Sequence, residues 1–245
     1  EEKLKNEEIV YPIIRTYQFS RPAVILGNAQ KAEGSFDFEL GEKRQIDLTK
    51  RNSGGGHMFY STNDLHFSFI SPLEYLGGRD PKDLISRYAR VNSTIVDVLK
   101  MCGYDTSLGR TSIRINNGRI VAGTARKEKR FASLQQGGIL VDNYDDDIFR
   151  LTMAREDEIE AWRGRVLTLG EINPNHRRVA STLKKMVNVP YTDLSYTEIT
   201  MARKLAEEFY SNRTWVLSGK KTAGLCLVAE YTKDNEEGVI VNAAA

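Results

Sequence analysis

Cysteine and long apolar segments are both scarce in this chain of 245 residues. The two cysteines, Cys102 and Cys226, show no CxxC spacing, so the sequence predicts neither a disulfide framework nor a zinc site. No stretch approaches the roughly 18 apolar residues of a membrane span, and no basic segment followed by an apolar run opens the chain. We therefore expect no membrane partner and a cytoplasmic location, or an organellar matrix if a targeting segment has been removed.

An excess of charge of one sign is lacking as well. Lysine and arginine number 35 against 33 acidic residues, which gives a formal net charge of +2. This balance gives no reason to expect nucleic acid as a partner. With 40% hydrophobic and 28% charged residues, the chain has the composition of a globular protein long enough to bury a large core.

The pattern of apolar residues predicts strands first and helices later. Short runs that alternate or are rich in β-branched residues predict strands at residues 13–19, 23–26, 66–70, 112–116, 119–123 and 138–141. An Asn-Asn-Gly turn at 116–118 predicts a hairpin, because Asn and Gly tolerate the positive φ of tight turns. Apolar spacing of three and four predicts helices at 81–101, 177–186 and 197–210. This order indicates an α+β fold, with a mixed or antiparallel sheet core and flanking helices.

A glycine-rich loop, Arg51-Asn52-Ser53-Gly54-Gly55-Gly56-His57, is the most informative segment. Three consecutive glycines let the backbone approach a ligand closely and leave several N–H groups unobstructed, while Arg51 can add a positive charge. The loop is therefore suited to a phosphate or an acyl phosphate. The triplet alone is equally typical of a flexible hairpin turn.

This loop and the strand after it, through Phe59 and the Asn63-x-Leu65-x-Phe67-Ser68 run, resemble the signature of lipoate-protein ligases, which are related to biotin ligases and octanoyltransferases. Further segments resemble the family in the same order along the chain, at residues 24–30, 118–125, 134–142, 178–181 and 207–215. The resemblance thus covers about residues 13 to 215. It implies a catalytic domain of the biotin and lipoate ligase type over residues 1–215. Beyond the matched region, apolar runs at 225–231 and 238–243 predict two strands, so residues 216–245 form a short β-rich tail and are a candidate start of an accessory unit.

The resemblance also implies a reaction. Lipoate or octanoate would be activated by ATP, with Mg²⁺, as an acyl adenylate and transferred to a lysine of a lipoyl domain. That domain would belong to a carrier such as a 2-oxoacid dehydrogenase E2 subunit or a glycine-cleavage H protein, and a separate accessory chain could complete the enzyme. No residue of the chain is expected to bind a metal directly.

Substrate-binding residues carried over from the family fall into three groups. Arg51 and the three glycines of the loop would hold the acyl and phosphate end, Gly27, Asn28 and Gln30 would border the acyl pocket, and the hairpin would contact the adenylate. The full set implied by the resemblance is Gly27, Asn28, Gln30, Arg51, Ser53, Gly54, Gly55, Gly56, His57, Tyr60, Gly123, Thr124, Ala125 and Gln136. His57 is preferred over His66, which should face the opposite side of its strand from Phe67 and Phe69.

Several positions depart from the family pattern. The principal catalytic lysine of the family is replaced by Ile120, so no catalytic residue is assigned. Thr111-Ser112 replaces an Asn-Asp pair, and Tyr60-Ser61 replaces His-Asp. A missing cation in a site that stabilises phosphate charge should be costly unless another group replaces it. The candidates by proximity in sequence are Arg114, Arg119, Arg126, Lys127 and Lys129, although each one alone is also typical of a solvated hairpin charge.

Three functions remain open at this point. They are an ATP-dependent ligase, an ATP-independent octanoyl or lipoyl transferase, and a member that binds an acyl chain or lipoyl domain without catalysis. The transferases of this kind use a cysteine, and neither cysteine of this chain is at the expected place: Cys102 ends a predicted helix and Cys226 lies in an apolar strand. Biotin is not expected, because no Lys-Trp-Pro-Asn-like run is present.

Overall fold

The computed structural model describes residues 12–33, 36–78, 80–115, 118–142, 144, 146–152, 155–173, 179, 181–182, 196–210 and 216–217. Most of the helix expected at 177–186 lies outside these residues. So do the turn residues 116 and 117 and all but the first two positions of the tail at 216–245.

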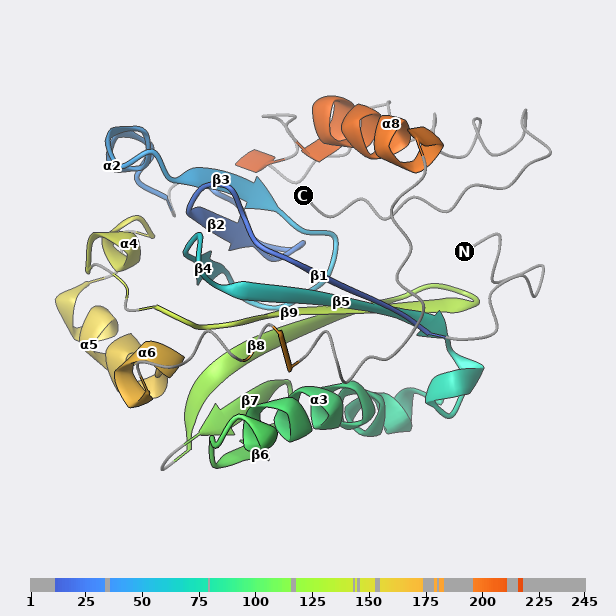
Figure 1. Ribbon diagram of the computed structural model, residues 1–245. Coiled ribbons are helices and arrows are strands. Elements are labelled where there is room, and N and C mark those ends of the chain that lie inside the picture. Colours follow the sequence, from blue (N-terminus) through green and yellow to red (C-terminus); the bar gives the residue numbers. More distant parts are fainter. Residues whose placement is uncertain are drawn as a thin grey trace.

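Six antiparallel strands form the main sheet (Figure 1). Their order across the sheet is β1 (Ile13–Tyr17), β5 (Leu65–Pro72), β9 (Ala132–Ile139), β8 (Arg119–Glu128), β7 (Ser112–Ile115) and β6 (Thr106–Leu108). The expected pairing across the hairpin is present, since β7 and β8 are antiparallel neighbours.

A second, smaller sheet lies over the main one. Its central strand β2 (Ala23–Leu26) pairs in parallel with β3 (Asp47–Lys50) and antiparallel with β4 (Met58–Tyr60). The architecture is therefore mixed, as the α+β prediction required.

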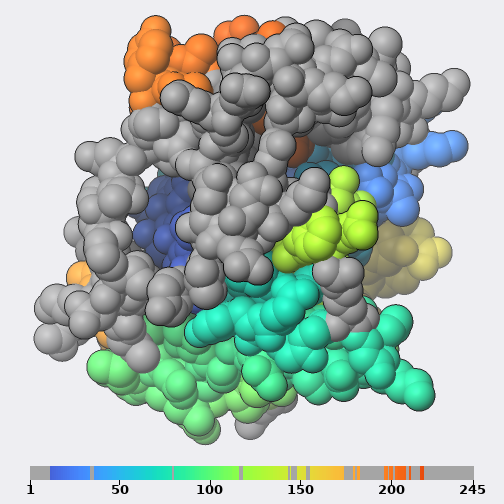
Figure 2. All heavy atoms as spheres, turned by 90° about the vertical axis from the view of Figure 1, so that its right-hand side faces the viewer, coloured from blue at the N-terminus to red at the C-terminus, as the bar shows by residue number. Residues whose placement is uncertain are grey.

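Helices flank the two sheets. The longest, α3 (Leu84–Met101), follows a short 3-10 turn η2 (Pro81–Asp83) and covers one face of the main sheet, which confirms the helix expected at 81–101. On the side of the small sheet, α8 (Tyr196–Leu205) lies at the opposite end of the molecule from α3 in both views (Figures 1 and 2). The remaining elements are α2 (Phe38–Lys43), η1 (Glu74–Leu76), α4 (Asp146–Arg150), α5 (Glu156–Arg165), α6 (Leu169–Ile172) and a π-helical segment η3 (Ala206–Tyr210). No helix in these ranges is both long and apolar enough to cross a bilayer.

The main core lies between α3 and the sheet. Side chains from α3, such as Val91 and Ile95, pack against Phe67 and Phe69 of β5 and against the buried residues of the hairpin. Because side chains alternate along a strand, the residues between these core positions face the other side of the sheet. That second face, together with the small sheet, positions the candidate site.

The sequence prediction of strands needs correction in three respects. The strand expected at 138–141 is β9 (Ala132–Ile139), which begins six residues earlier and ends before Leu140. The first part of β9 was not predicted because it contains polar residues and shows no apolar pattern. One of them, Gln135, is fully buried and is held by hydrogen bonds to Asn92 and Arg126 rather than by apolar contacts. β8 is also longer than expected, and the short strands β3, β4 and β6 carry too few residues to show a period.

Candidate active site

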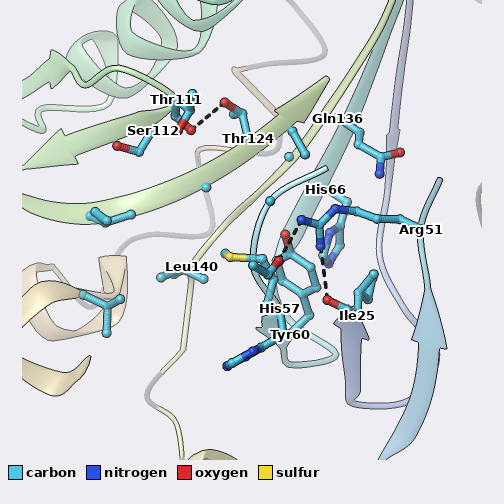
Figure 3. A pocket seen from close by; sticks show the side chains of 18 of the residues that line it. Ile25, Arg51, His57, Tyr60, His66, Thr111, Ser112, Thr124, Gln136 and Leu140 are labelled. Carbon is cyan, nitrogen blue, oxygen red and sulfur yellow. Dashed lines mark hydrogen bonds between the residues drawn. The ribbon is translucent and has the colours of Figure 1, made fainter. Parts of the chain in front are cut away.

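A cavity of about 410 Å³ lies between the small sheet and the face of the main sheet opposite α3 (Figure 3). It is lined by side chains from β1, β2, β4, β5, β7, β8 and β9, by the glycine-rich loop, and by Trp162 of α5. Of the residues expected to bind substrate, nine line it: Arg51, Gly55, Gly56, His57, Tyr60, Gly123, Thr124, Ala125 and Gln136.

One row of directly paired residues crosses five strands, and four of its five members, all except Gly138, line the cavity. Tyr17 pairs with His66, His66 with Gly138, Gly138 with Gly123, and Gly123 with Ser112. Directly opposed residues in antiparallel strands share one face of a sheet, so this row faces the small sheet as a whole.

The two glycines in the middle of that row make room for β4. A Cβ atom on Gly138 would lie 2.4 Å from a ring carbon of Tyr60, and one on Gly123 would lie 2.6 Å from the terminal methyl of Met58. Real Cβ atoms essentially never show contacts this short. The close approach of β4 therefore requires that Gly138 lack a side chain under the rigid Tyr60 ring, whereas at Gly123 the flexible end of Met58 could shift.

A β-bulge in the hairpin directs Ile120 into the cavity. Ser112 pairs with Gly123 and Ile113 with Ala122, but Arg114 pairs with Ile120, so Val121 is the extra residue. Val121 and Ala122 are consecutive, and both are fully buried in the core beneath α3. Strict alternation would have placed Ile120 on the α3 face with Ala122; the bulge places it on the cavity face, opposite Arg114.

Arg51 ties the glycine-rich loop together from inside. Its guanidinium donates to the carbonyl oxygen of Ile25 at 3.1 Å (Figure 3) and to those of Gly54 at 2.8 Å and Gly56 at 2.7 Å. The sequence had suggested Arg51 as a direct ligand of phosphate. In the structure three backbone carbonyls, two from the loop and one from β2, occupy its guanidinium, so its first role is to fix the loop's shape against β2.

Gly27 supports the same loop from the end of β2. A Cβ atom there would lie 1.9 Å from the carbonyl oxygen of Gly55, so only glycine fits. Gly27 itself does not line the cavity; it lets the loop lie against β2. By contrast, nothing lies within 4 Å of where a Cβ atom on Gly54 would be.

The side chain of Gln30 links Gly27 to His57. Its side-chain oxygen accepts from the Gly27 amide at 2.9 Å, and its side-chain nitrogen lies 3.3 Å from Nδ1 of His57. If that nitrogen donates, the proton of the neutral ring is on Nε2. Burial, and secondarily the charge of Arg51, lower the pKa of His57, so the ring is neutral at pH 7. Buried Lys50 donates to the Gln30 carbonyl oxygen at 2.5 Å.

The remaining predicted residues brace the loop rather than line the cavity. Ser53 is fully buried, and its hydroxyl accepts from the side-chain amide of Gln136 at 3.1 Å. The backbone amide of Asn28 donates to the Ser53 carbonyl at 2.9 Å. Five predicted residues are therefore supporting ones by position: Gly27, Asn28, Gln30, Ser53 and Gly54.

Aromatic rings surround an imidazole at one end of the cavity. His66 stacks on Tyr17 at 5.3 Å and meets the rings of Phe19 and Tyr60 edge-on, each at 4.2 Å between centroids. Burial lowers the pKa of His66 to about 3 and raises that of the Tyr60 hydroxyl. Nε2 of His66 has no hydrogen-bond partner among the described residues. The ring of His66 is therefore neutral at pH 7, and Arg51, whose charge acts on the pKa of Tyr60, lies beside this aromatic cluster.

Cations lie at the other end, on β7 and the residues before it. Arg110, Ser112 and Arg114 occur at every second position and all line the cavity. Neighbouring Thr111 uses its carbonyl to accept from the Thr124 hydroxyl at 2.8 Å, so that hydroxyl already has a protein partner (Figure 3).

Of the five candidate replacement cations, Arg114 alone lines the cavity. Arg126 is buried on the α3 face, where Gln135, Ser133, Glu128 and the Arg87 carbonyl accept its hydrogen bonds. Sequence reasoning missed Arg110, Tyr17 and His66 as cavity residues. A signal existed for the first, because the Arg-x-Ser-x-Arg spacing puts all three side chains on one face of a strand.

No aspartate or glutamate is among the cavity residues of the described ranges. Within those ranges, no group of three or more His, Cys, Asp or Glu side chains is placed to hold a metal ion. Protein sites for Mg²⁺ commonly use one or two carboxylates besides substrate phosphates. The described cavity therefore does not fit a Mg²⁺ ion held by the protein itself.

Comparisons with known proteins agree with this architecture. Residues 2–189 match the family model for the lipoyl protein ligase A/B catalytic domain. Lipoate-protein ligase A subunit 1 of Thermoplasma acidophilum is 25% identical over 227 residues, which cover 83% of this chain and 84% of that protein. The octanoyltransferase LipM of Carboxydothermus hydrogenoformans is 24% identical over 238 residues, 84% of this chain and 86% of that protein.

Solved structures share the fold. A chain from the bipartite lipoate protein ligase and E2 lipoyl domain of Thermoplasma acidophilum superposes with a TM-score of 0.73 at 22% identity, covering 90% of both chains. Lipoate-protein ligase A bound with ATP gives 0.67 at 23% identity, covering 88% of this chain and 90% of that one. The chain therefore belongs to the lipoyl protein ligase A/B catalytic-domain family, a family of enzymes.

Proposed function

We propose that this chain is an ATP-dependent ligase that attaches lipoate, or octanoate, to a lysine of a lipoyl domain. In the first step a carboxylate oxygen of the fatty acid attacks the α-phosphorus of ATP, and the bond to pyrophosphate breaks. In the second, the lysine amine attacks the acyl carbon of the resulting adenylate, AMP leaves with the electron pair of the carbon–oxygen bond, and the amine proton passes to solvent.

The polarity of the cavity carries this proposal. Its aromatic end around the neutral ring of His66 and its cationic end at Arg114 lie on β5 and β7, three strand spacings or about 14 Å apart, and the guanidinium of Arg51 near the aromatic end is already bound to three carbonyl oxygens. An acid with a long apolar chain and an activated, negatively charged head matches both ends at once. With no carboxylate among the described cavity residues, an anionic head meets no repulsion there.

The lack of a thiol in the described cavity favours the ligase over the transferase. A transferase that forms a thioester needs a cysteine beside the acyl carbon. Cys102 is half-buried at the C-terminal end of α3, on the opposite side of the main sheet from the cavity. Cys226 lies outside the described residues.

ATP and a lipoyl domain are supported as reaction partners by relatives. A lipoate-protein ligase A of this fold has been solved with ATP, and the Thermoplasma acidophilum system comprises a bipartite ligase and an E2 lipoyl domain. We propose the same classes of partner for this chain, including a separate accessory chain, within the cytoplasm or an organellar matrix. Mg²⁺ would then enter with the phosphates of ATP rather than on protein carboxylates.

The test is a mass measurement on an apo lipoyl domain incubated with this protein and lipoate, with or without ATP and Mg²⁺. A parallel reaction supplies octanoyl carrier protein without ATP. Lipoylation that requires ATP supports the ligase, and acylation from the thioester alone supports the transferase. Binding of lipoate with no acylation under either condition, even after addition of a candidate accessory chain, would leave only the binding role.

A further inference from the structure

The cationic end of the cavity is built differently from the glycine-rich loop. In the glycine-rich loop, the guanidinium of Arg51 is occupied by three carbonyl oxygens. Arg110 and Arg114 are instead exposed, and neither has an acidic partner within the part of the chain that the structure describes. Uncompensated cations that line an acid-free cavity create a positive potential suited to an anion.

Arg114 is also held in position. Its Nη1 donates to the Gly118 carbonyl at 2.6 Å, and its Nε would lie 3.0 Å from a Cβ atom on Gly109, so the absence of a side chain at Gly109 makes room for it. One guanidinium nitrogen is thus anchored to the turn region, while Nη2 and Nε keep N–H groups available. A pre-positioned guanidinium loses less entropy when it binds a phosphate than a free one does.

The bulge at Val121 brings Ile120 and Arg114 directly opposite each other on the cavity face. Cβ atoms of opposed residues in adjacent antiparallel strands lie about 5 Å apart. A cation on either strand can therefore serve the same part of the cavity. The apolar side chain of Ile120 leaves that part to Arg114.

We infer that Arg114, assisted by Arg110, is the residue that binds the α-phosphate of the acyl adenylate in this protein. The inference rests on the proposed ligase function and adds the residues that hold its charged intermediate. Ser112 lies between the two arginines in the sequence and also lines the cavity, so it can add a hydroxyl donor. The phosphate is then bound from β7 rather than by the glycine-rich loop.

The experiment compares two ligands by calorimetric titration. One is a stable analogue of lipoyl-AMP in which the acyl carbonyl is reduced to methylene, so that the phosphate charge remains. The other is lipoamide, which has the same chain and no charge. Arg114→Leu should weaken binding of the phosphate analogue about 10- to 100-fold and that of lipoamide less than twofold, because a charge-assisted hydrogen bond is lost.

The matched control is Arg119→Leu, which removes the same charge from the same hairpin at a residue that does not line the cavity. It should leave both affinities within twofold. Adding Ile120→Lys to Arg114→Leu should recover at least part of the lost affinity, since the new ammonium extends from the opposed position. Thermal melts of each variant show whether it is folded.

The outcomes separate the two proposals. Equal losses from Arg114→Leu and Arg119→Leu, or none from a folded Arg114→Leu protein, overturn the assignment of Arg114 and leave the ligase proposal intact. A wild-type protein that binds lipoamide but not the phosphate analogue overturns both. Selective loss with Arg114→Leu and recovery with Ile120→Lys establish the phosphate site.

Discussion

Replacing Gly27 by alanine tests the close contact between the glycine-rich loop and the end of β2. The added Cβ atom would lie 1.9 Å from the carbonyl oxygen of Gly55, whereas real contacts of this kind stay above 3.0 Å, so the carbonyl must move by 3.0 − 1.9, about 1 Å. The neighbouring carbonyls of Gly54 and Gly56, both bound by Arg51, belong to the same loop and must follow.

The expected cost has two parts. Overpacking of this kind destabilises proteins by about 1–3 kcal/mol, and each kcal/mol lowers the melting temperature of a domain this size by about 2–4 °C. Displacement of His57 and the loop amides should also weaken binding of lipoate, by about tenfold if 1.4 kcal/mol of contact is lost. Urea unfolding and calorimetric titration with lipoate measure the two effects.

Gly54→Ala is the control from the same loop, because its Cβ atom would meet nothing within 4 Å. Its stability should be unchanged or slightly higher, since alanine reduces the freedom of the unfolded chain. If both variants unfold at the same urea concentration and bind lipoate equally well, the loop does not lie against Gly27 as described.

Three other perturbations have defined outcomes. The pKa of His66 is about 3 in the folded protein, below the roughly 6.5 of the unfolded chain. Its titration therefore lowers the free energy of unfolding by up to about 1.4 kcal/mol per pH unit as pH falls from 6.5 towards 3. Buried Asp64, whose pKa is raised to about 6 by burial, has the opposite effect on stability between pH 4 and 6. Because His66→Phe removes the histidine titration and leaves that of Asp64, the free energy of unfolding of the variant relative to wild type should be higher at pH 5 than at pH 7 in urea titrations. A difference that does not change with pH would contradict the buried neutral imidazole. Glu128→Ala should destabilise by about 3–5 kcal/mol, because it leaves the buried guanidiniums of Arg87 and Arg126 without their shared carboxylate, and a loss below 1 kcal/mol in chemical unfolding would mean that water replaces it. Lipoate and octanoate should raise the melting temperature while acetate and biotin do not, since each buried methylene contributes about 0.8 kcal/mol, and stabilisation by biotin alone would point to another substrate.

Local sequence was sufficient for several parts of this protein. The spacing of apolar residues predicted α3, and the alternating strands around an Asn-Asn-Gly turn predicted the β7–β8 pairing. The glycine triplet indicated a loop that approaches a ligand, and two of its glycines do line the cavity. Alternation also placed His66 on the opposite face from Phe67 and Phe69. These features depend on residues close together in the chain, where period and turn chemistry are informative.

Only the tertiary structure decided what each face meets. Alternation of side chains along β5 predicts that His66 and Phe67 lie on opposite faces of the sheet. The order of strands and the packing of α3 determine which face is core and which lines the cavity. Arg51 appeared free to bind phosphate because the sequence does not show where the carbonyls of its own loop point. The bulge at Val121 reversed the face of Ile120 and set it against Arg114, and a one-residue shift of register depends on pairing between strands rather than on either strand alone.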